Sequence, residues 1–270
     1  MPSWCIPNNS IIIVHDWIPL YGLKQGYFLK YFYSSMRCIL ICLSWMLTRK
    51  TFNVVCISEA TQSDTLRLLR YSRRKHLISY GYQDTLTPVV LSYPRFVDYN
   101  YSLERSRILL FADYQPHKNL KLTLQALRVL KAQPANGITV TIIAKSKALR
   151  QRVLEVCPYA DVYLLPSDAQ LALLMRESRY ILYLSTVEGF GLPVFEAFHH
   201  GSIPVVYPSK VNTEILGLDY PYYADTVDRA LSIIKCPPNL QLYYLYANKT
   251  SNRVNSNSLN SRLNSLLSLW

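Results

Sequence analysis

The chain has 270 residues, of which 50% are hydrophobic and 17% charged, so it can form one large domain or two small ones. Its formal net charge is +12, and such a surface attracts anions such as nucleoside diphosphates, nucleic acids or anionic lipid headgroups. No signal peptide is recognisable, and the longest apolar run, residues 38–47, has about half the length of a membrane-spanning helix. We therefore expect a cytoplasmic globular protein.

Apolar runs of strand length alternate with helix-length segments in the first hundred residues. The pattern predicts strands at 10–14, 53–58, 76–80 and 88–93, and helices at 24–48 and 60–70. This series is too short for a complete doubly wound domain. We interpret residues 1–100 as a truncated N-terminal α/β domain.

A second and longer series begins near residue 107. It predicts strands at 107–112, 137–144, 161–165, 179–185 and 202–207, and helices at 117–132, 147–157, 169–178 and 192–200. Continuous apolar strands that alternate with helices indicate a parallel sheet covered on both faces. The fold class is therefore α/β, with a complete Rossmann-like doubly wound domain at residues 101–245.

The remaining residues, 246–270, are expected to form a helical tail. Leucines 259, 263, 266 and 267 fall on one helical face, which predicts a helix docked on the body after a frayed polar stretch from Asn248.

The six cysteines indicate neither a disulfide framework nor a metal centre. None belongs to a CxxC pair, and Cys56 lies inside the strand-like run at 53–58. We expect reduced thiols that pack as small apolar side chains, and no bound metal.

The segment after the strand at 179–185 has the composition of a ligand-binding turn. It contains Gly189 and Gly191, two residues apart, which allow a tight turn and a close approach of the backbone to a ligand. Pro193 suits the first turn of a helix, whose free N–H groups favour a phosphate. Glu188 and Glu196 flank the turn and can accept hydrogen bonds from sugar or ribose hydroxyls. A glycine turn between a strand and a helix can also be ordinary α/β structure.

The whole string is more specific than the turn alone. Glu188, Glu196 and the segment GSIPVV at 201–206 closely resemble the signature of glycosyltransferase family four, which comprises retaining enzymes of the GT-B fold. The resemblance implies a nucleoside-diphosphate sugar as donor, with no cofactor or metal. It places Glu196 on the ribose and Glu188 on the sugar hydroxyls. It assigns the diphosphate to the backbone of the turn, formed by Gly189, Phe190, Gly191 and Leu192.

Two further segments resemble the family in the same order along the chain. The segment RILLFADYQPHKNL at 107–120 resembles the strand, loop and helix start whose lysine contacts the donor diphosphate, which implies that function for Lys118. The segment VHDWIPL at 14–20 resembles the strand end that carries a histidine over the donor sugar, which implies a catalytic position for His15. From the residues alone, Lys118 could be a solvated lysine at a helix start and His15 a structural histidine. Ser58 or Glu59 is a weaker candidate for the cleft wall, and Glu214 is expected to be structural.

The sequence also departs from the family. Only fourteen residues precede His15, so we expect the first strands of the usual N-terminal domain to be missing, and Ala112 and Asp113 stand where the family often has a glycine and a basic residue. A non-catalytic or partner-dependent nucleotide-sugar-binding subunit, in a homo- or hetero-oligomer, therefore remains an alternative to an active transferase. The acceptor could be a glycan, a lipid-linked sugar or a protein.

Basic residues at 67–75 leave two other partners open. Arg67, Arg70, Arg73, Arg74 and Lys75 could bind nucleic acid, but no nucleic-acid-binding module is recognisable and none is expected. Together with Lys24, Lys30, Arg37 and Arg49, the cluster could instead hold the protein peripherally on an anionic membrane.

Overall fold

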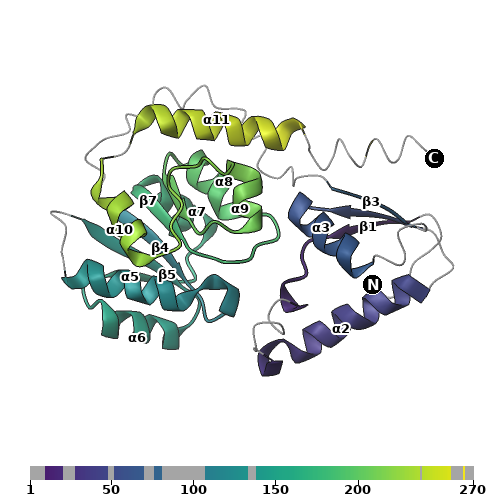
Figure 1. The fold of residues 1–270 in the computed structure, drawn as a ribbon. Helices are drawn as coiled ribbons and strands as arrows, with labels where there is room; N and C mark the ends of the chain where they lie inside the picture. Colours follow the sequence, from purple (N-terminus) through teal and green to yellow (C-terminus); the bar gives the residue numbers. More distant parts are fainter. Residues whose placement is uncertain are drawn as a thin grey trace. The chain divides into compact units, whose positions relative to one another are not determined.

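The computed structural model describes residues 10–20, 28–47, 52–69, 76–80, 107–132, 138–237, 239–256 and 264 (Figure 1). The chain divides into two compact units. The first unit comprises residues 1–87, 187–190 and 252–270, and the second comprises residues 88–186 and 191–251. The split near residue 87 lies before the domain boundary that we predicted at residue 100, and four residues of the glycine turn belong to the first unit.

The first unit contains a small parallel sheet of the order β1-β2-β3. Its strands are β1 (Ser10–Val14), β2 (Phe52–Cys56) and β3 (His76–Tyr80), and its helices are α2 (Phe28–Leu47) and α3 (Glu59–Leu68). These elements confirm the predicted ones to within a few residues. The strand predicted at 88–93 lies outside the described residues.

Two tryptophans organise the core of the first unit. Trp17, just after β1, and Trp45, in α2, meet edge to face with their ring centroids 6.3 Å apart. The Trp17 indole N–H donates to Thr65 Oγ1 of α3 at 2.8 Å, which satisfies its buried donor. The core thus fixes the end of β1, where His15 lies, against both helices.

The second unit contains a five-stranded parallel sheet of the order β6-β5-β4-β7-β8. Its strands are β4 (Arg107–Ala112), β5 (Thr139–Ala144), β6 (Asp161–Leu164), β7 (Ser178–Tyr183) and β8 (Ile203–Val206). Consecutive residues Ile108, Leu109 and Leu110 are all inaccessible to solvent, so both faces of β4 are covered. The predicted doubly wound arrangement is confirmed, and strand order reverses on either side of β4.

Helices surround this sheet. They are α5 (Leu120–Ala132), α6 (Lys147–Val156), α7 (Asp168–Arg176), α8 (Leu192–His199), α9 (Lys210–Leu216) and α10 (Val227–Lys235). Residues of α7 and α8 pack with Leu109, Ile143 and Ile181 in one apolar cluster. Several helices begin at a hydroxyl cap, as at Ser146 and Ser167, because the side-chain oxygen accepts a hydrogen bond from an otherwise free N–H group.

The helix predicted to begin at His117 begins later. Residues Pro116–Lys118 form a single 3₁₀ turn, η4, and Asn119 adopts a left-handed conformation with φ of 52°. This break separates Lys118 from α5, so the lysine projects from a turn rather than from a helix.

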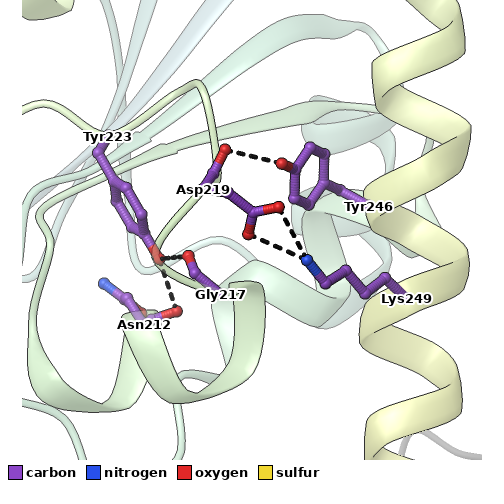
Figure 2. Close-up of polar contacts among 6 residues, drawn as sticks. All are labelled: Asn212, Gly217, Asp219, Tyr223, Tyr246 and Lys249. Carbon is purple, nitrogen blue, oxygen red and sulfur yellow. Dashed lines mark hydrogen bonds and ion pairs between the residues drawn. The ribbon is translucent and has the colours of Figure 1, made fainter.

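The last described helix, α11 (Leu240–Ser256), is continuous across the tail boundary that we predicted at residue 246. Figure 2 shows how it attaches to the loop after α9: the Tyr246 hydroxyl donates to the Asp219 carbonyl at 2.7 Å, and Lys249 pairs with the Asp219 carboxylate at 3.0 Å. The leucines 259, 263, 266 and 267 lie outside the described residues. The helix therefore starts before the polar stretch, because Tyr243 and Tyr246 supply its buried face.

The described cysteines, Cys38, Cys42, Cys56, Cys157 and Cys236, are free thiols; Cys236 is exposed, whereas the other four are buried or half-buried. Within the described ranges, no helix is both long and apolar enough to cross a membrane.

Candidate functional site

A pocket of about 180 Å³ opens at the carboxyl edge of the five-stranded sheet. It lies where β4, β5 and β7 end, beside the start of α8. Its wall is formed by Phe111, Ala112, Asp113, Lys118, Ile143, Lys145, Tyr183, Leu184, Ser185 and Pro193. Ligands of open α/β sheets bind in this crevice, next to the strand at which the order reverses.

Lys118 is held in the wall of this pocket by the end of β7. The carbonyl of the preceding residue, His117, accepts hydrogen bonds from Ser185 Oγ at 2.9 Å and from the Thr186 N–H at 2.8 Å. The Lys118 ammonium donates to the Tyr183 hydroxyl at 2.7 Å and lies 5.0 Å from the centroid of that ring. The turn at Pro116–Lys118 and the Lys118 side chain are therefore both held by residues at or just after the end of β7, and the ammonium group lies at the pocket.

A second lysine, which the sequence analysis missed, lines the same pocket. Lys145 follows β5 directly and forms an ion pair of 3.0 Å with Asp113, which follows β4. Burial would raise the pKa of the Asp113 carboxyl, but the hydrogen bonds from Lys145 and from the Gln115 N–H outweigh it and hold that pKa below its usual range. Asp113 is thus ionised at neutral pH and positions Lys145.

A sequence signal for Lys145 did exist. It is the first polar residue after a buried strand of the parallel sheet, as Asp113 is, and the carboxyl ends of such strands share one edge. Only the register of β4 against β5, in which Ala112 pairs with Ala144, shows that the two side chains are neighbours.

The start of α8 provides backbone donors next to the lysines. Gly191 caps the helix with φ of 82°, a left-handed conformation that favours glycine, and Pro193 occupies the first turn. Leu192 is half-buried and begins the helix. Pro193 has no N–H and the Val194 N–H donates to the Gly191 carbonyl at 3.0 Å, so the remaining N–H groups and the positive end of the helix dipole are what suit a phosphate.

Glu196 lies one turn further along α8 and is half-buried. Burial, reinforced by the negative charge of Asp168, raises the pKa of its carboxyl. The raised pKa means that ionising Glu196 is costly until a partner donates to it.

The other predicted residues belong to the first unit, where Gly189 packs against the end of β1. A Cβ atom on Gly189 would lie 2.5 Å from the His15 carbonyl oxygen, so only glycine fits. The Thr61 hydroxyl lies 3.4 Å from both the His15 and the Gly189 carbonyl oxygens. His15 itself is exposed, so its ring is available to a ligand.

The structure therefore brings the predicted residues together in two sets. Lys118 joins Gly191, Leu192 and Glu196 in the second unit, whereas His15 joins Glu188, Gly189 and Phe190 in the first. Glu188 is half-buried and Phe190 is buried. The meeting of the two sets around one ligand stays a prediction.

Of the weaker candidates, Ser58 has a structural function. Ser58 caps α3, because its hydroxyl accepts from the Thr61 N–H at 3.1 Å, and it is buried. Glu59 is exposed in the first turn of α3, and Glu214 is half-buried in α9.

Sequence comparison identifies relatives of the second unit. Residues 98–225 match the family model described as glycosyl transferases group 1. A segment of 119 residues is 32% identical to a GDP-mannose:cellobiosyl-diphosphopolyprenol alpha-mannosyltransferase from Komagataeibacter xylinus. That match covers 42% of this chain but only 30% of the relative, so the chain spans less than a third of that protein.

Structural comparison extends over both units. HepE from Anabaena, solved in complex with UDP and glucose, superposes with a TM-score of 0.64 at 16% identity, covering 98% of this chain and 73% of HepE. WaaG, a glycosyltransferase involved in lipopolysaccharide biosynthesis, gives a TM-score of 0.62 at 13% identity, covering 93% of this chain and 71% of WaaG. At these identities the similarity shows the fold alone, which is GT-B-like. The segment that matches the family model described as glycosyl transferases group 1, residues 98–225, contains the pocket, its two lysines and the glycine turn.

Proposed function

We propose that this protein transfers a sugar from a nucleoside-diphosphate sugar to an acceptor hydroxyl. The observation that carries the proposal is the pair of ammonium groups, Lys118 and Lys145, that line one pocket beside the start of α8. A diphosphate needs such a cationic site, and the family match at residues 98–225 supports a sugar nucleotide as its source.

The second unit binds the donor. Lys118, Lys145 and the first N–H groups of α8 hold the diphosphate, and Glu196 accepts from the ribose hydroxyls. The cations stabilise the negative charge that develops on the departing β-phosphate as the bond to the sugar breaks. The lysines and the helix dipole supply this charge, so that no metal is required.

The first unit supplies the residues around the sugar. Glu188 accepts from sugar hydroxyls, and His15 lies near the reaction centre. The bond between the anomeric carbon and the phosphate oxygen breaks while the acceptor oxygen bonds to that carbon on the same face. The acceptor proton passes to the departing phosphate, and the anomeric configuration is retained.

The donor and the acceptor are suggested by the relatives. The K. xylinus relative is named for GDP-mannose and a diphosphopolyprenol-linked acceptor, and HepE was solved with UDP and glucose. GDP-mannose and UDP-glucose are therefore the first donors to test, with a lipid-linked sugar as the first acceptor.

The test is a turnover assay combined with calorimetry. We expect the purified protein to bind GDP or UDP and to release it from the matching sugar nucleotide when acceptor is present. Glu188→Ala should abolish turnover without abolishing binding of the nucleoside diphosphate. Binding without turnover in the wild-type protein would favour a nucleotide-sugar-binding subunit, and no binding of either nucleotide would contradict the proposal.

A further inference from the structure

In the first unit, the end of β1 and the glycine turn meet at one buried side chain of α3. The carbonyl oxygens of His15 and Gly189 both lie 3.4 Å from the hydroxyl oxygen of Thr61, in the first turn of that helix. The two segments also touch each other, because a Cβ atom on Gly189 would lie 2.5 Å from the same His15 oxygen. Thr61 thus lies where the backbone that carries His15 reaches the backbone of the turn.

The hydrogen bonds around Thr61 show that its hydroxyl is a donor to these carbonyls. Its oxygen accepts from Ser58 Oγ at 2.9 Å, and Ser58 Oγ in turn accepts from the Thr61 N–H at 3.1 Å. The Thr61 hydroxyl hydrogen is therefore left to donate, and a carbonyl oxygen can only accept. Because two carbonyls share one hydrogen, both distances exceed the about 2.8 Å that is usual for a hydroxyl donor. Thr61 is 4% exposed, so water does not compete for this hydrogen.

The hydroxyl hydrogen also keeps the two carbonyl groups together. Both oxygens carry a partial negative charge and face the same point, so they repel each other unless a donor lies between them. With a methyl group in place of the hydroxyl, both would face an apolar atom in a buried place, which is unfavourable for a carbonyl group. The strand end and the turn would then move apart, although Ser58 would still cap α3.

Holding the two carbonyls fixes the direction of groups that the proposed reaction uses. The Phe190 N–H belongs to the same planar peptide unit as the Gly189 carbonyl and points to the opposite side. Glu188 directly precedes Gly189, and the His15 side chain leaves the backbone next to the carbonyl that Thr61 holds. A displacement of about 1 Å in such groups can lower a reaction rate about a hundredfold.

From these contacts we infer that Thr61 is a positioning residue, which holds His15 and Glu188 in place through a hydrogen bond shared by two backbone carbonyls. It acts through the backbone and contacts neither donor nor acceptor. The inference rests on the proposed function, because it concerns the residues assigned to the sugar. It predicts an effect on turnover but not on nucleoside diphosphate binding, since Lys118 and Lys145 belong to the second unit.

The experiment compares Thr61→Val, which removes the hydroxyl at nearly constant volume, with Thr61→Ser, which keeps it. We expect Thr61→Val to lower kcat about tenfold to a hundredfold, while the Kd for GDP or UDP stays that of the wild-type protein. Thr61→Ser should retain most of the wild-type turnover. Hydrogen–deuterium exchange in the peptide that contains residues 187–190 should be faster in Thr61→Val than in the wild-type protein or in Thr61→Ser.

The matched control is Ser35→Ala, which also removes a buried hydroxyl of the first unit, one that donates to the Pro19 carbonyl at 2.6 Å. It should keep the wild-type turnover and the wild-type exchange at 187–190, even if its melting temperature falls as far as that of Thr61→Val. Unchanged turnover in Thr61→Val, or an equal loss in Thr61→Ser or Ser35→Ala, would overturn the inference.

Failure of the proposed function gives a different result. In that case the wild-type protein itself binds no nucleotide or transfers no sugar, and the exchange at residues 187–190 still tests the contact. Exchange that is equally slow in Thr61→Val and in the wild-type protein would then show that Thr61 does not hold the turn, and would overturn the inference as well.

Discussion

The Lys118 ammonium donates a 2.7 Å hydrogen bond to the hydroxyl of Tyr183, the last residue of β7. A free lysine side chain loses as much as about 2 kcal/mol of rotamer entropy when a ligand orders it. Because the tyrosine already restrains Lys118, part of this loss has occurred before the ligand binds. The hydrogen bond between Lys118 and Tyr183 is therefore expected to increase the affinity of the pocket for an anion.

We expect Lys118→Ala to weaken binding of a nucleoside diphosphate by about tenfold to a hundredfold, the usual effect of losing a hydrogen bond to a charged group. Binding of the uncharged nucleoside should change little. Calorimetric titration with both ligands measures the difference. Lys121→Ala, an exposed lysine on α5, is the control and should bind like the wild-type protein. Equal affinities for Lys118→Ala and wild type would remove Lys118 from the site.

For Lys145, we expect a smaller effect because its side chain is more than half exposed. Lys145→Ala should weaken diphosphate binding about threefold to tenfold, and the dependence of affinity on salt should become less steep. The control is Lys147→Ala, an exposed lysine two residues away at the start of α6. Titrations at two salt concentrations test this, and an unchanged salt dependence would assign Lys145 to the Asp113 ion pair alone.

Replacing Gly189 tests the packing of the glycine turn in the first unit. A methyl group there would meet the His15 carbonyl at 2.5 Å, so we expect Gly189→Ala to reduce the free energy of unfolding by about 1–3 kcal/mol. Urea denaturation measures the change. Val187→Ala, a half-buried substitution two residues earlier, is the control for altering the same turn without a clash. A fully stable Gly189→Ala variant would show that the close approach does not exist in solution.

The raised pKa of Glu196 predicts a pH dependence of nucleotide binding. A carboxylate accepts from ribose hydroxyls best when it is ionised, and burial followed by the charge of Asp168 raises the pKa above its ordinary value of 4.5. Affinity for a nucleoside should therefore fall as the pH drops through this raised value. Glu196→Gln should bind more weakly at neutral pH and lose the dependence, whereas a dependence that persists in Glu196→Gln would point to another group.

His200, at the end of α8, predicts an acid sensitivity of stability. Burial, together with the neighbouring His199 and Arg176, lowers the pKa of His200 to about 4 from an ordinary 6.5. Between pH 4 and pH 6.5, His200 binds a proton in the unfolded chain but not in the folded chain. The free energy of unfolding is therefore undiminished by His200 above pH 6.5 and falls as the pH drops towards 4. The loss should be of the order of 1–2 kcal/mol, because partial exposure screens the effect.

Urea denaturation at pH 7 and pH 4.5 measures this loss. His200→Gln should unfold with a smaller difference between the two pH values than the wild-type protein, because glutamine takes up no proton. An identical difference in the variant would assign the acid sensitivity to other groups.

Much of the architecture could be predicted because it depends on local patterns. The strand–helix alternation from residue 107 identified all five strands of the second sheet, since buried parallel strands are continuous apolar runs. The start of α5 was wrong by three residues, because the left-handed Asn119 interrupts a segment whose composition is helical throughout. The first part of α11 was not predicted as a helix, because its buried face depends on contacts between distant residues: the Tyr243 hydroxyl donates to the Phe198 carbonyl of α8, and the Tyr246 hydroxyl donates to the Asp219 carbonyl after α9.

The sequence by itself determined the fold class, the resemblance of the second unit to a glycosyltransferase family and the position of the glycine turn, because each depends on a contiguous run of residues. Only the tertiary structure decided that Asp113 and Lys145, 32 positions apart, pair in the same pocket as Lys118, and that a Cβ atom at residue 189 would meet His15. The physical reason is that strand order and register set which strand ends are neighbours. The charge of the pocket is therefore set by side chains from several neighbouring strand ends and not by the residues of one strand end.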